Sequence, residues 1–556
     1  MHMMVDNSEE PACPPKMQSE VDATRVVPHR FGSSYASIIL EIIVLLLIFF
    51  AYAGDAAPMV NESHYLVKAK SYWNPEWCNN DPFVSSGKAH LTFYYTVGWL
   101  TKFFSLDATA WIGRLFGWTL IAGGLVHLTR NLFGKPFLSA PLSILWIAGI
   151  QYGNLAGEWV IGGIEAKVPA YGFVLFGIAA MVKRQWDQSW IFFGIASAFH
   201  VLTGGWSVVA GLFVWMITER SRPDRTGLFR WPLILGGLIA LTGLIPALSL
   251  QAGVDPQEGQ RAARIYTFYR LPHHLVPSSF QVSWYMRHAL LITATMMLAI
   301  KTPQTKRLNR LAYYAGGAFG IACIGFCIGM TIEFNPNVTA KLLRYYWFRL
   351  SDAMIPLIFA CLMTSLLLSK NRNHLRFARI TLVLATLVTS QDVIQRIRLG
   401  VPPAVSNRVL GFEPDATIES QQKAHHDWIE VCNWARRSSP SDELFITPRH
   451  QQTFKWYADR AELANWKDVP QDASSLIKWH QTFQELYPQR LGNNRVTIQY
   501  PTLRKYREQF GVRWMIVDRR IVGEHLPLVR VYPSKDETND TYAIYELPVS
   551  QGSTSQ

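Results

Sequence analysis

The chain has 556 residues, of which 49% are hydrophobic and 13% aromatic, and its formal net charge is +13. This hydrophobic content is high for a soluble protein, and the apolar residues fall in blocks of roughly 15 to 20, enough helix to cross most of a bilayer core. A nucleic-acid binder would concentrate its basic residues on one soluble face. Here many of them lie in short connectors between apolar blocks, so the composition excludes a soluble globular protein and indicates a lipid bilayer, not nucleic acid, as the partner.

The N-terminal segment is polar and contains proline. We therefore predict that residues 1–35 form a disordered cytoplasmic tail. The apolar run at residues 37–52 starts too late and is too long for a signal peptide, so we expect it to remain as the first membrane anchor.

Apolar blocks then recur along the chain and predict about eleven transmembrane helices within residues 36–393. They begin near residues 37, 110, 138, 168, 189, 207, 232, 288, 312, 353 and 380. With the N-terminus in the cytoplasm, the connectors expected on that side are all short and basic, as the positive-inside rule requires. An odd number of spans places residues 394–556 on the extracytoplasmic side of the plasma (inner) membrane.

The first outer loop, residues 55–108, is much longer than a connector needs, and long loops are often functional. It carries Asp55, Glu62, His64 and Asp81 among many aromatic residues. Two stretches of it, 61–73 and 89–104, have the composition of amphipathic helices that lie at the membrane interface. For any single acid in this loop, a solvated position at headgroup level is the alternative reading.

The second outer segment reads GEWVIGGIEAKVPAY and places Glu158, Glu165 and Lys167 at the membrane edge. Ionisable groups at that depth are costly and mark a candidate functional site. The alternative is a surface ion pair between Glu165 and Lys167.

The third and fourth outer segments are rich in cations and aromatic residues. They carry Arg264, Arg270, His273, His274, Arg344 and Arg349. Arginine can hold phosphate oxygens with two parallel hydrogen bonds, and aromatic residues settle at headgroup level, so this pattern favours a lipid phosphate. Nonspecific anchoring to headgroups is the alternative, but basic residues on the outer side run against the charge rule.

Beyond residue 395 the composition becomes polar and charged, and helical and strand patterns alternate. Residues 421–437 and 474–489 have helical spacing, and ELFITP, VRWMIVD, LVRVYP and YAIYEL read as strands. Gly511 is expected to close another helix. We therefore predict a small extracytoplasmic α/β domain over residues 394–556. Cys78 and Cys432 both fall on the outer side, and their spacing leaves open whether they pair.

With its many spans, long first outer loop and C-terminal outer domain, the chain resembles the GT-C superfamily of membrane glycosyltransferases. The family has an acidic pair soon after the first span, and NESHYL is similar to it, with Asn61 in place of the first acid. The resemblance implies that Glu62 is the catalytic base, and Asp55 and Asp81 remain alternatives for that role.

Carboxylates on the first two outer segments and cations on the next two suit sugar transfer from a polyprenyl-phosphate donor to an acceptor on the outer face. A carboxylate would take the acceptor proton, and Arg and His would neutralise the departing phosphate. This scheme demands no metal and no cofactor. Alternatives are a transporter or flippase for a lipid-linked or anionic solute, a noncatalytic envelope assembly protein, and a ligase or polymerase that relies on the outer Arg and His.

Overall fold

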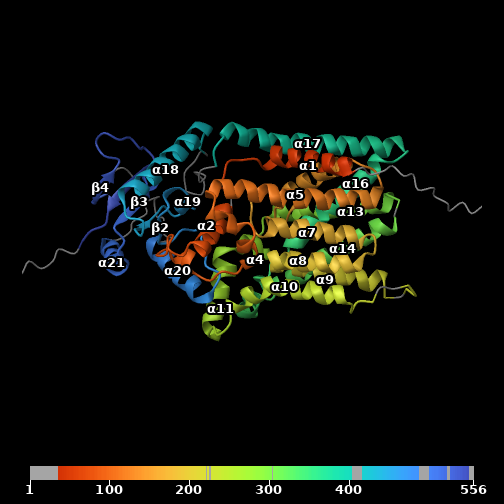
Figure 1. Cartoon of the computed structure of the whole chain (residues 1–556), viewed down its shortest axis with the longest axis horizontal. Helices are drawn as coiled ribbons and strands as arrows, with labels where there is room; N and C mark the ends of the chain where they lie inside the picture. The colour runs from red at the N-terminus through yellow and green to blue at the C-terminus, as the bar shows by residue number, and fades with distance from the viewer. Residues whose placement is uncertain are drawn as a thin grey trace, which may run out of the picture.

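The computed structural model describes residues 35–59, 61–220, 222–224, 227–303, 305–402, 416–487, 500–522 and 526–549. Apart from Tyr35, the predicted cytoplasmic tail lies outside these residues. Figure 1 shows two regions along the longest axis: a bundle of long helices, and a smaller region that contains a β-sheet. The chain therefore has the predicted combination of a helical membrane part and a C-terminal α/β part.

Each of the predicted apolar blocks coincides with a helix. These helices are α1 (Tyr35–Ala53), α5 (Leu106–Phe133), α6 (Ser139–Gly153), α7 (Lys167–Met181), α8 (Trp186–Phe199), α9 (Val201–Thr218), α10 (Trp231–Ser249), α13 (Val282–Lys301), α14 (Lys306–Gly329), α16 (Arg349–Leu367) and α17 (Arg372–Leu399). Within the described residues, seven are long and apolar enough to cross a membrane: α1, α5, α9, α10, α14, α16 and α17. The helices α6, α7 and α8 have only 14 or 15 residues, shorter than the about 20 of a typical span. The protein is thus a multi-pass membrane protein. Of the eleven predicted spans, α6, α7 and α8 are too short by this criterion, and α13, with 20 residues, is long enough but is not among the seven.

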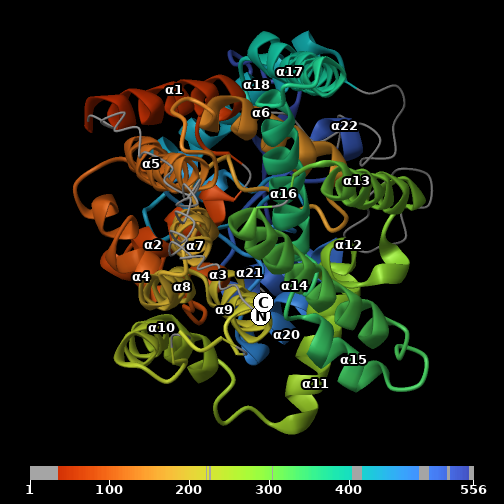
Figure 2. The same cartoon turned by 90° about the vertical axis from the view of Figure 1, so that its right-hand side faces the viewer.

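The bundle interior is formed by α7 and α16, which lie inside the other helices when the bundle is viewed from its end (Figure 2). Close helix approach depends on small residues, as is usual between membrane helices. A Cβ atom on Gly194 of α8 would lie 2.2 Å from the carbonyl oxygen of Gly236 in α10. These two helices can cross at this distance only because both positions are glycine.

The first outer loop folds into short helices at the end of the bundle that faces the sheet region (Figure 1). These are α2 (Glu62–Trp73), α3 (Pro82–Ser85), α4 (Leu91–Tyr95) and the 3-10 turn η1 (Gly98–Lys102). The remaining connections contain α11 (Pro256–Arg264), the π-helical turn η2 (Ile265–Arg270), α12 (Pro272–Leu275), the 3-10 turn η3 (Pro277–Ser279) and α15 (Pro336–Leu343). The first predicted interfacial helix is therefore continuous, whereas the second is divided at Thr96 and Val97.

The C-terminal region is a five-stranded mixed sheet with helices on both faces. Its elements are α18 (Ile418–Ser438), β1 (Leu444–Ile446), α19 (Phe454–Ala458), β2 (Ala461–Glu462), α20 (Ala473–Leu486), α21 (Tyr500–Phe510), β3 (Trp514–Asp518), α22 (Arg519–Val522), β4 (Val529–Tyr532) and β5 (Tyr542–Glu546). The strand order is β2-β1-β3-β5-β4, with β1 parallel to β2 and β3, and β5 antiparallel to β3 and β4. Alternate residues of β3 point to opposite faces: Trp514 and Ile516 join the core beneath α18, and Met515 and Val517 join the core beneath α20.

The core beneath α20 extends beyond the C-terminal region. It includes Cys78 of the first outer loop and Ala262 and Ile265 of the third. Cys432 belongs to the core on the other face of the sheet, and both cysteines are free. The sheet region is thus fastened to two outer loops by apolar packing, which fixes its position over the end of the bundle.

Candidate active site

A polar cavity of about 170 Å³ lies where the outer loops meet the C-terminal region. Its lining comes from α2, the connector between α6 and α7, the junction of α8 and α9, the segment η2–α12, the start of α16, and the loop after β2. The charged and imidazole side chains that line it are His64, Glu158, Glu165, Lys167, His200, Arg270, His274, Arg349 and Lys467. Segments from distant parts of the chain therefore converge on one site.

Two carboxylates and two cations form a chain of contacts along one wall. The Nζ atom of Lys167 lies 3.0 Å from Oε1 of Glu158 and 3.0 Å from Oε1 of Glu165. The Nε atom of Arg349 lies 2.8 Å from Oε2 of Glu158, and the amide of Asn61 donates to Oε2 of Glu165 at 2.6 Å. Because Arg270 and Lys467 add two further cations, the lining carries an excess of two positive charges.

Arg270 and Lys467 make no ion pair with a carboxylate among the described residues. The Nε–H of Arg270 donates to the carbonyl oxygen of Trp466 at 2.8 Å, and its guanidinium lies 4.7 Å above that indole ring. Burial lowers the pKa of Lys467 to about 8, so its ammonium is mostly charged at neutral pH. Both cations therefore remain available to an anion in the cavity.

Two buried acids hold the connector that carries Glu158 and Glu165. At its start, Asp352 of α16 accepts hydrogen bonds from the backbone N–H groups of Leu155 and Ala156, both at 2.8 Å. Near its end, Glu62 accepts from the N–H of Ile164 at 2.8 Å. A backbone fixed at both ends keeps the two lining carboxylates in place, as a preorganised site requires.

His274 presents a neutral imidazole. Its Nδ1 lies 2.6 Å from the carbonyl oxygen of Ala156, which can only accept, so Nδ1 carries the proton. Burial lowers the pKa of His274 to about 3. The ring is therefore an uncharged part of the cavity wall at neutral pH.

A second cavity of about 250 Å³ adjoins the first and is more apolar. Six residues line both: Tyr65, His200, Tyr266, Tyr346, Arg349 and Gln471. The apolar part of the second cavity is formed at α8, α9 and α10 by Phe199, Val201, Leu202, Leu244, Ala247 and Leu248. A polar compartment and an apolar compartment are thus continuous at Arg349.

The structure brings most of the predicted binding residues together. His64, Glu158, Glu165, Lys167, Arg270, His274 and Arg349 line the polar cavity. Arg344 borders the apolar cavity instead. His273 is exposed with its ring 4.1 Å from that of His274, and Arg264 is exposed on α11; neither lines these two cavities.

The three residues predicted as the catalytic base do not line the polar cavity. Glu62 is fully buried and forms a two-pronged ion pair with Arg114, from Nε to Oε1 at 2.7 Å and from Nη2 to Oε2 at 2.6 Å. Asp55 pairs with Arg396 of α17. Asp81 caps α3 through the N–H groups of Phe83 and Val84 and lies against Lys455. All three carboxylates are engaged with neighbours, and a catalytic role for them stays a prediction.

Some lining residues carried little or no signal in the sequence. Lys467 and Gln471 lie in a polar loop of the C-terminal region. His200 lies between the apolar helices α8 and α9. Its Nε2 accepts from Nη1 of Arg349 at 3.0 Å, and nothing in its sequence position indicates this partner.

A possible metal-ligating group is found away from the cavity. Within the described residues, His426, Asp427 and Glu430 of α18 offer ligand atoms within 4.8 Å of one another. Asp427 also accepts hydrogen bonds from the backbone and hydroxyl of Thr541. The group lines neither of the two cavities, so it has no part in the candidate site.

Comparison with known proteins finds a matching family model and matching solved structures. Residues 426–486 match a family described as a domain of unknown function (DUF6798). No curated protein matches the chain. A crystal structure of ArnT from Cupriavidus metallidurans bound to undecaprenyl phosphate matches over 93% of this chain and 99% of that one, at 13% identity and a TM-score of 0.48. This match transfers no residue role, so function is inferred from the cavities of this chain.

Proposed function

We propose that the protein transfers a sugar from a polyprenyl-phosphate donor to an acceptor at the polar cavity. The observation that carries this proposal is the junction at Arg349, where a cavity with two excess positive charges meets an apolar one. An amphiphile with an anionic head and a hydrocarbon tail fits this pair of compartments. A soluble sugar nucleotide would have no use for the apolar compartment.

The charge of the polar cavity suits a phosphate group. Arginine holds phosphate oxygens through a planar fork of donors, and lysine neutralises them as a point charge. Arg349, Lys167, Arg270 and Lys467 offer donors on several sides of the cavity. As the bond between the sugar C1 and the phosphate oxygen breaks, these cations stabilise the negative charge that develops on the leaving phosphate.

The apolar cavity suits the first isoprene units of the lipid. Its wall includes Leu244, Ala247 and Leu248 of α10, a helix that is largely exposed on its outer surface and apolar enough to cross the membrane. Each methylene removed from water contributes about 0.8 kcal/mol to binding. The tail therefore supplies affinity, while the cations position the phosphate.

Binding of a long-chain polyprenyl phosphate to the purified full-length protein tests the proposal. We expect it to raise the melting temperature more than the matching polyprenol or inorganic phosphate does, because only the phosphate lipid fills both compartments. Equal shifts with polyprenol and polyprenyl phosphate would contradict a phosphate site.

The variant Arg270→Ala is expected to weaken polyprenyl-phosphate binding roughly tenfold, since a hydrogen bond to a charged group contributes about 1.5–3 kcal/mol and water replaces part of it. Titration of the melting temperature or of tryptophan fluorescence measures the change. Arg287→Ala is the matched control, because Arg287 is exposed on α13 and, among the described residues, its side chain has a hydrogen bond only to the backbone of Ser283. Equal weakening by both variants would point to general attraction of the lipid to basic residues.

A further inference from the structure

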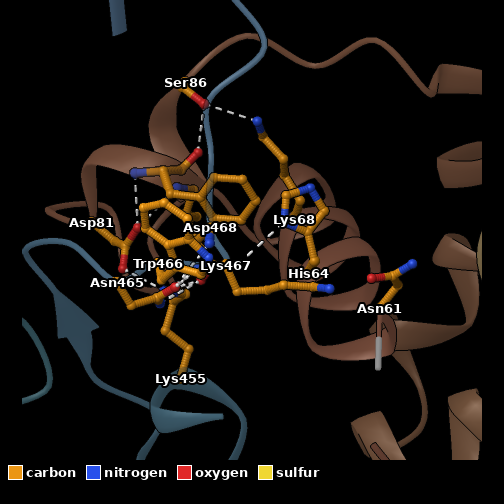
Figure 3. Close-up of polar contacts among 12 residues, drawn as sticks. Asn61, His64, Lys68, Asp81, Ser86, Lys455, Asn465, Trp466, Lys467 and Asp468 are labelled. Atoms are coloured by element: carbon orange, nitrogen blue, oxygen red, sulfur yellow. Dashed lines mark hydrogen bonds and ion pairs between the residues drawn. The ribbon is translucent and has the colours of Figure 1, made fainter. Parts of the chain in front are cut away.

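A buried ion cluster joins the first outer loop to the C-terminal region next to the polar cavity (Figure 3). At its centre, Nζ of Lys455 lies 3.1 Å from Asp81, 2.7 Å from Glu462 and 2.7 Å from Asp468. All four side chains are at most 2% exposed. Three carboxylates around one ammonium leave an excess of negative charge, which is costly in a buried place unless further donors compensate for it.

Hydrogen bonds supply part of that compensation. The amide of Asn465 donates to Glu462 at 2.8 Å and to Oδ2 of Asp468 at 3.0 Å. Burial alone would raise the pKa of Asp468, but the charge on Lys455 and a hydrogen bond from His64 hold that pKa below its usual range. Asp468 is therefore ionised, and its Oδ1 faces the ring of His64 at 3.3 Å from Nδ1.

This contact fixes the tautomer of His64. A carboxylate can only accept, so Nδ1 carries the proton and Nε2 keeps its lone pair. The ring packs on Phe83, with centroids 4.5 Å apart, and it lines the polar cavity. Within the described part of the chain, Nε2 has no hydrogen-bond partner.

The charge state of His64 suits a base. Burial lowers its pKa; Asp468 opposes the shift, and Lys68 and Lys467 add to it. Of the groups packed around the ring, Lys68 has its own pKa lowered by burial to about 7, and His90 to about 4. Burial thus keeps His64 neutral at physiological pH, and the carboxylate of Asp468 stabilises the imidazolium once it forms.

We propose that His64 is the catalytic base of the polar cavity, and that Asp468, itself held by Lys455, is its positioning residue. The proposal rests on the proposed transfer reaction and names its proton acceptor and the class of its second substrate, a hydroxyl or amine compound. It also gives a role to the segment that matches the domain of unknown function, which contains both Lys455 and Asp468. The C-terminal region then completes the active site as well as covering it.

The acceptor O–H or N–H gives its proton to Nε2 of His64 while the oxygen or nitrogen lone pair forms a bond to C1 of the sugar. The bond between C1 and the phosphate oxygen breaks, and its electron pair leaves with the polyprenyl phosphate. His64 becomes an imidazolium paired with Asp468, and the proton passes to water after product release.

The lining carboxylates are less suited to this step. Both oxygens of Glu158 contact a cation, one Lys167 and the other Arg349. The oxygens of Glu165 contact Lys167 and the amide of Asn61. In contrast, Nε2 of His64 has no such partner among the residues that the structure describes.

Release of polyprenyl phosphate from a polyprenyl-phosphate hexose tests the proposal, with water or an added alcohol as acceptor. His64→Gln should slow release about 10²- to 10⁴-fold, the usual contribution of a general base, with polyprenyl-phosphate binding unchanged. His426→Gln, on the exposed side of α18, should match the wild-type protein. Wild-type release by His64→Gln would overturn the base assignment alone, whereas failure of the wild-type protein to bind the lipid would overturn the proposed function.

Asp468→Asn tests the positioning role. The Asp468 carboxylate raises the imidazole pKa, so its loss should move the acid limb of the pH–rate profile to lower pH and slow release at neutral pH. Asp459→Asn is the matched control, because Asp459 also links the first outer loop to the C-terminal region, through Lys70 and Trp77, but lies outside the cavity. An unchanged acid limb in Asp468→Asn would contradict the role of Asp468.

Carbethoxylation by diethyl pyrocarbonate gives a readout that needs no turnover, because a histidine reacts with the reagent only through the free nitrogen of its neutral imidazole. Mass spectrometry should find His64 modified with a midpoint below pH 6.5, the usual imidazole pKa, and protected by polyprenyl phosphate. A His64 that stays unmodified in the folded protein would show that Nε2 is not accessible, and the proposal would fail.

Discussion

Glu62→Gln is expected to destabilise the fold by about 3–5 kcal/mol, because it removes one partner of a fully buried ion pair and leaves the other charge uncompensated. Arg114 would keep its charge with both side chains of the former pair 0% exposed. The carboxylate also accepts from the backbone N–H groups of Met59 and Ile164, and an amide can replace only one acceptor oxygen. The melting temperature and the yield of folded protein in detergent measure the loss.

A double variant distinguishes a structural role of Glu62 from a catalytic one. Glu62→Gln with Arg114→Gln removes both charges and should recover part of the lost stability. Asp55→Asn is the matched single change, since its pair with Arg396 is about one-third exposed and such pairs contribute at most about 1 kcal/mol. A Glu62→Gln protein that melts like the wild type but transfers no sugar would instead support Glu62 as the base.

The helices were predictable because their signal is local. A block of apolar residues is read directly from the chain, so each predicted block became a helix. The number of spans was less accessible, since α6, α7 and α8 are short and lie largely among other helices. A short helix can lie in the membrane part when neighbouring helices surround it. The sequence does not show which helices are neighbours.

Many of the charged residues that line the cavity were predictable from the sequence, but the partner of each charge was not. Charged residues at the membrane edge are costly enough to indicate a site, and seven predicted binding residues line the cavity. The partner of each charge depends on the fold: Arg114 lies 52 positions from Glu62, and Asp468 lies 404 positions from His64. The contacts of Glu62 with Arg114 and with the N–H of Ile164 were therefore not visible in the sequence, and its predicted role as the base stays a prediction.

Arg349→Ala is expected to weaken polyprenyl-phosphate binding by about 2 kcal/mol, or roughly 30-fold in Kd. Arg349 lines both cavities, and its guanidinium contacts Glu158 at 2.8 Å and His200 at 3.0 Å. Its loss halves the excess positive charge at the point where the phosphate meets the tail. Arg349→Lys should recover only part of the affinity, because lysine keeps the charge but not the planar fork.

Glu158→Gln is expected to change the affinity for polyprenyl phosphate in the opposite direction. Removing this carboxylate raises the excess positive charge of the cavity and releases Arg349 from an ion pair, so polyprenyl phosphate should bind more tightly than to the wild-type protein. General damage to the cavity would weaken binding in both variants, whereas electrostatic recognition of the phosphate requires opposite changes. Raising the salt concentration should reduce both differences, since ions screen charges in a cavity that water can enter. Weaker binding by Glu158→Gln, or a Kd for Arg349→Ala equal to that of the wild type, would remove Arg349 from the phosphate site.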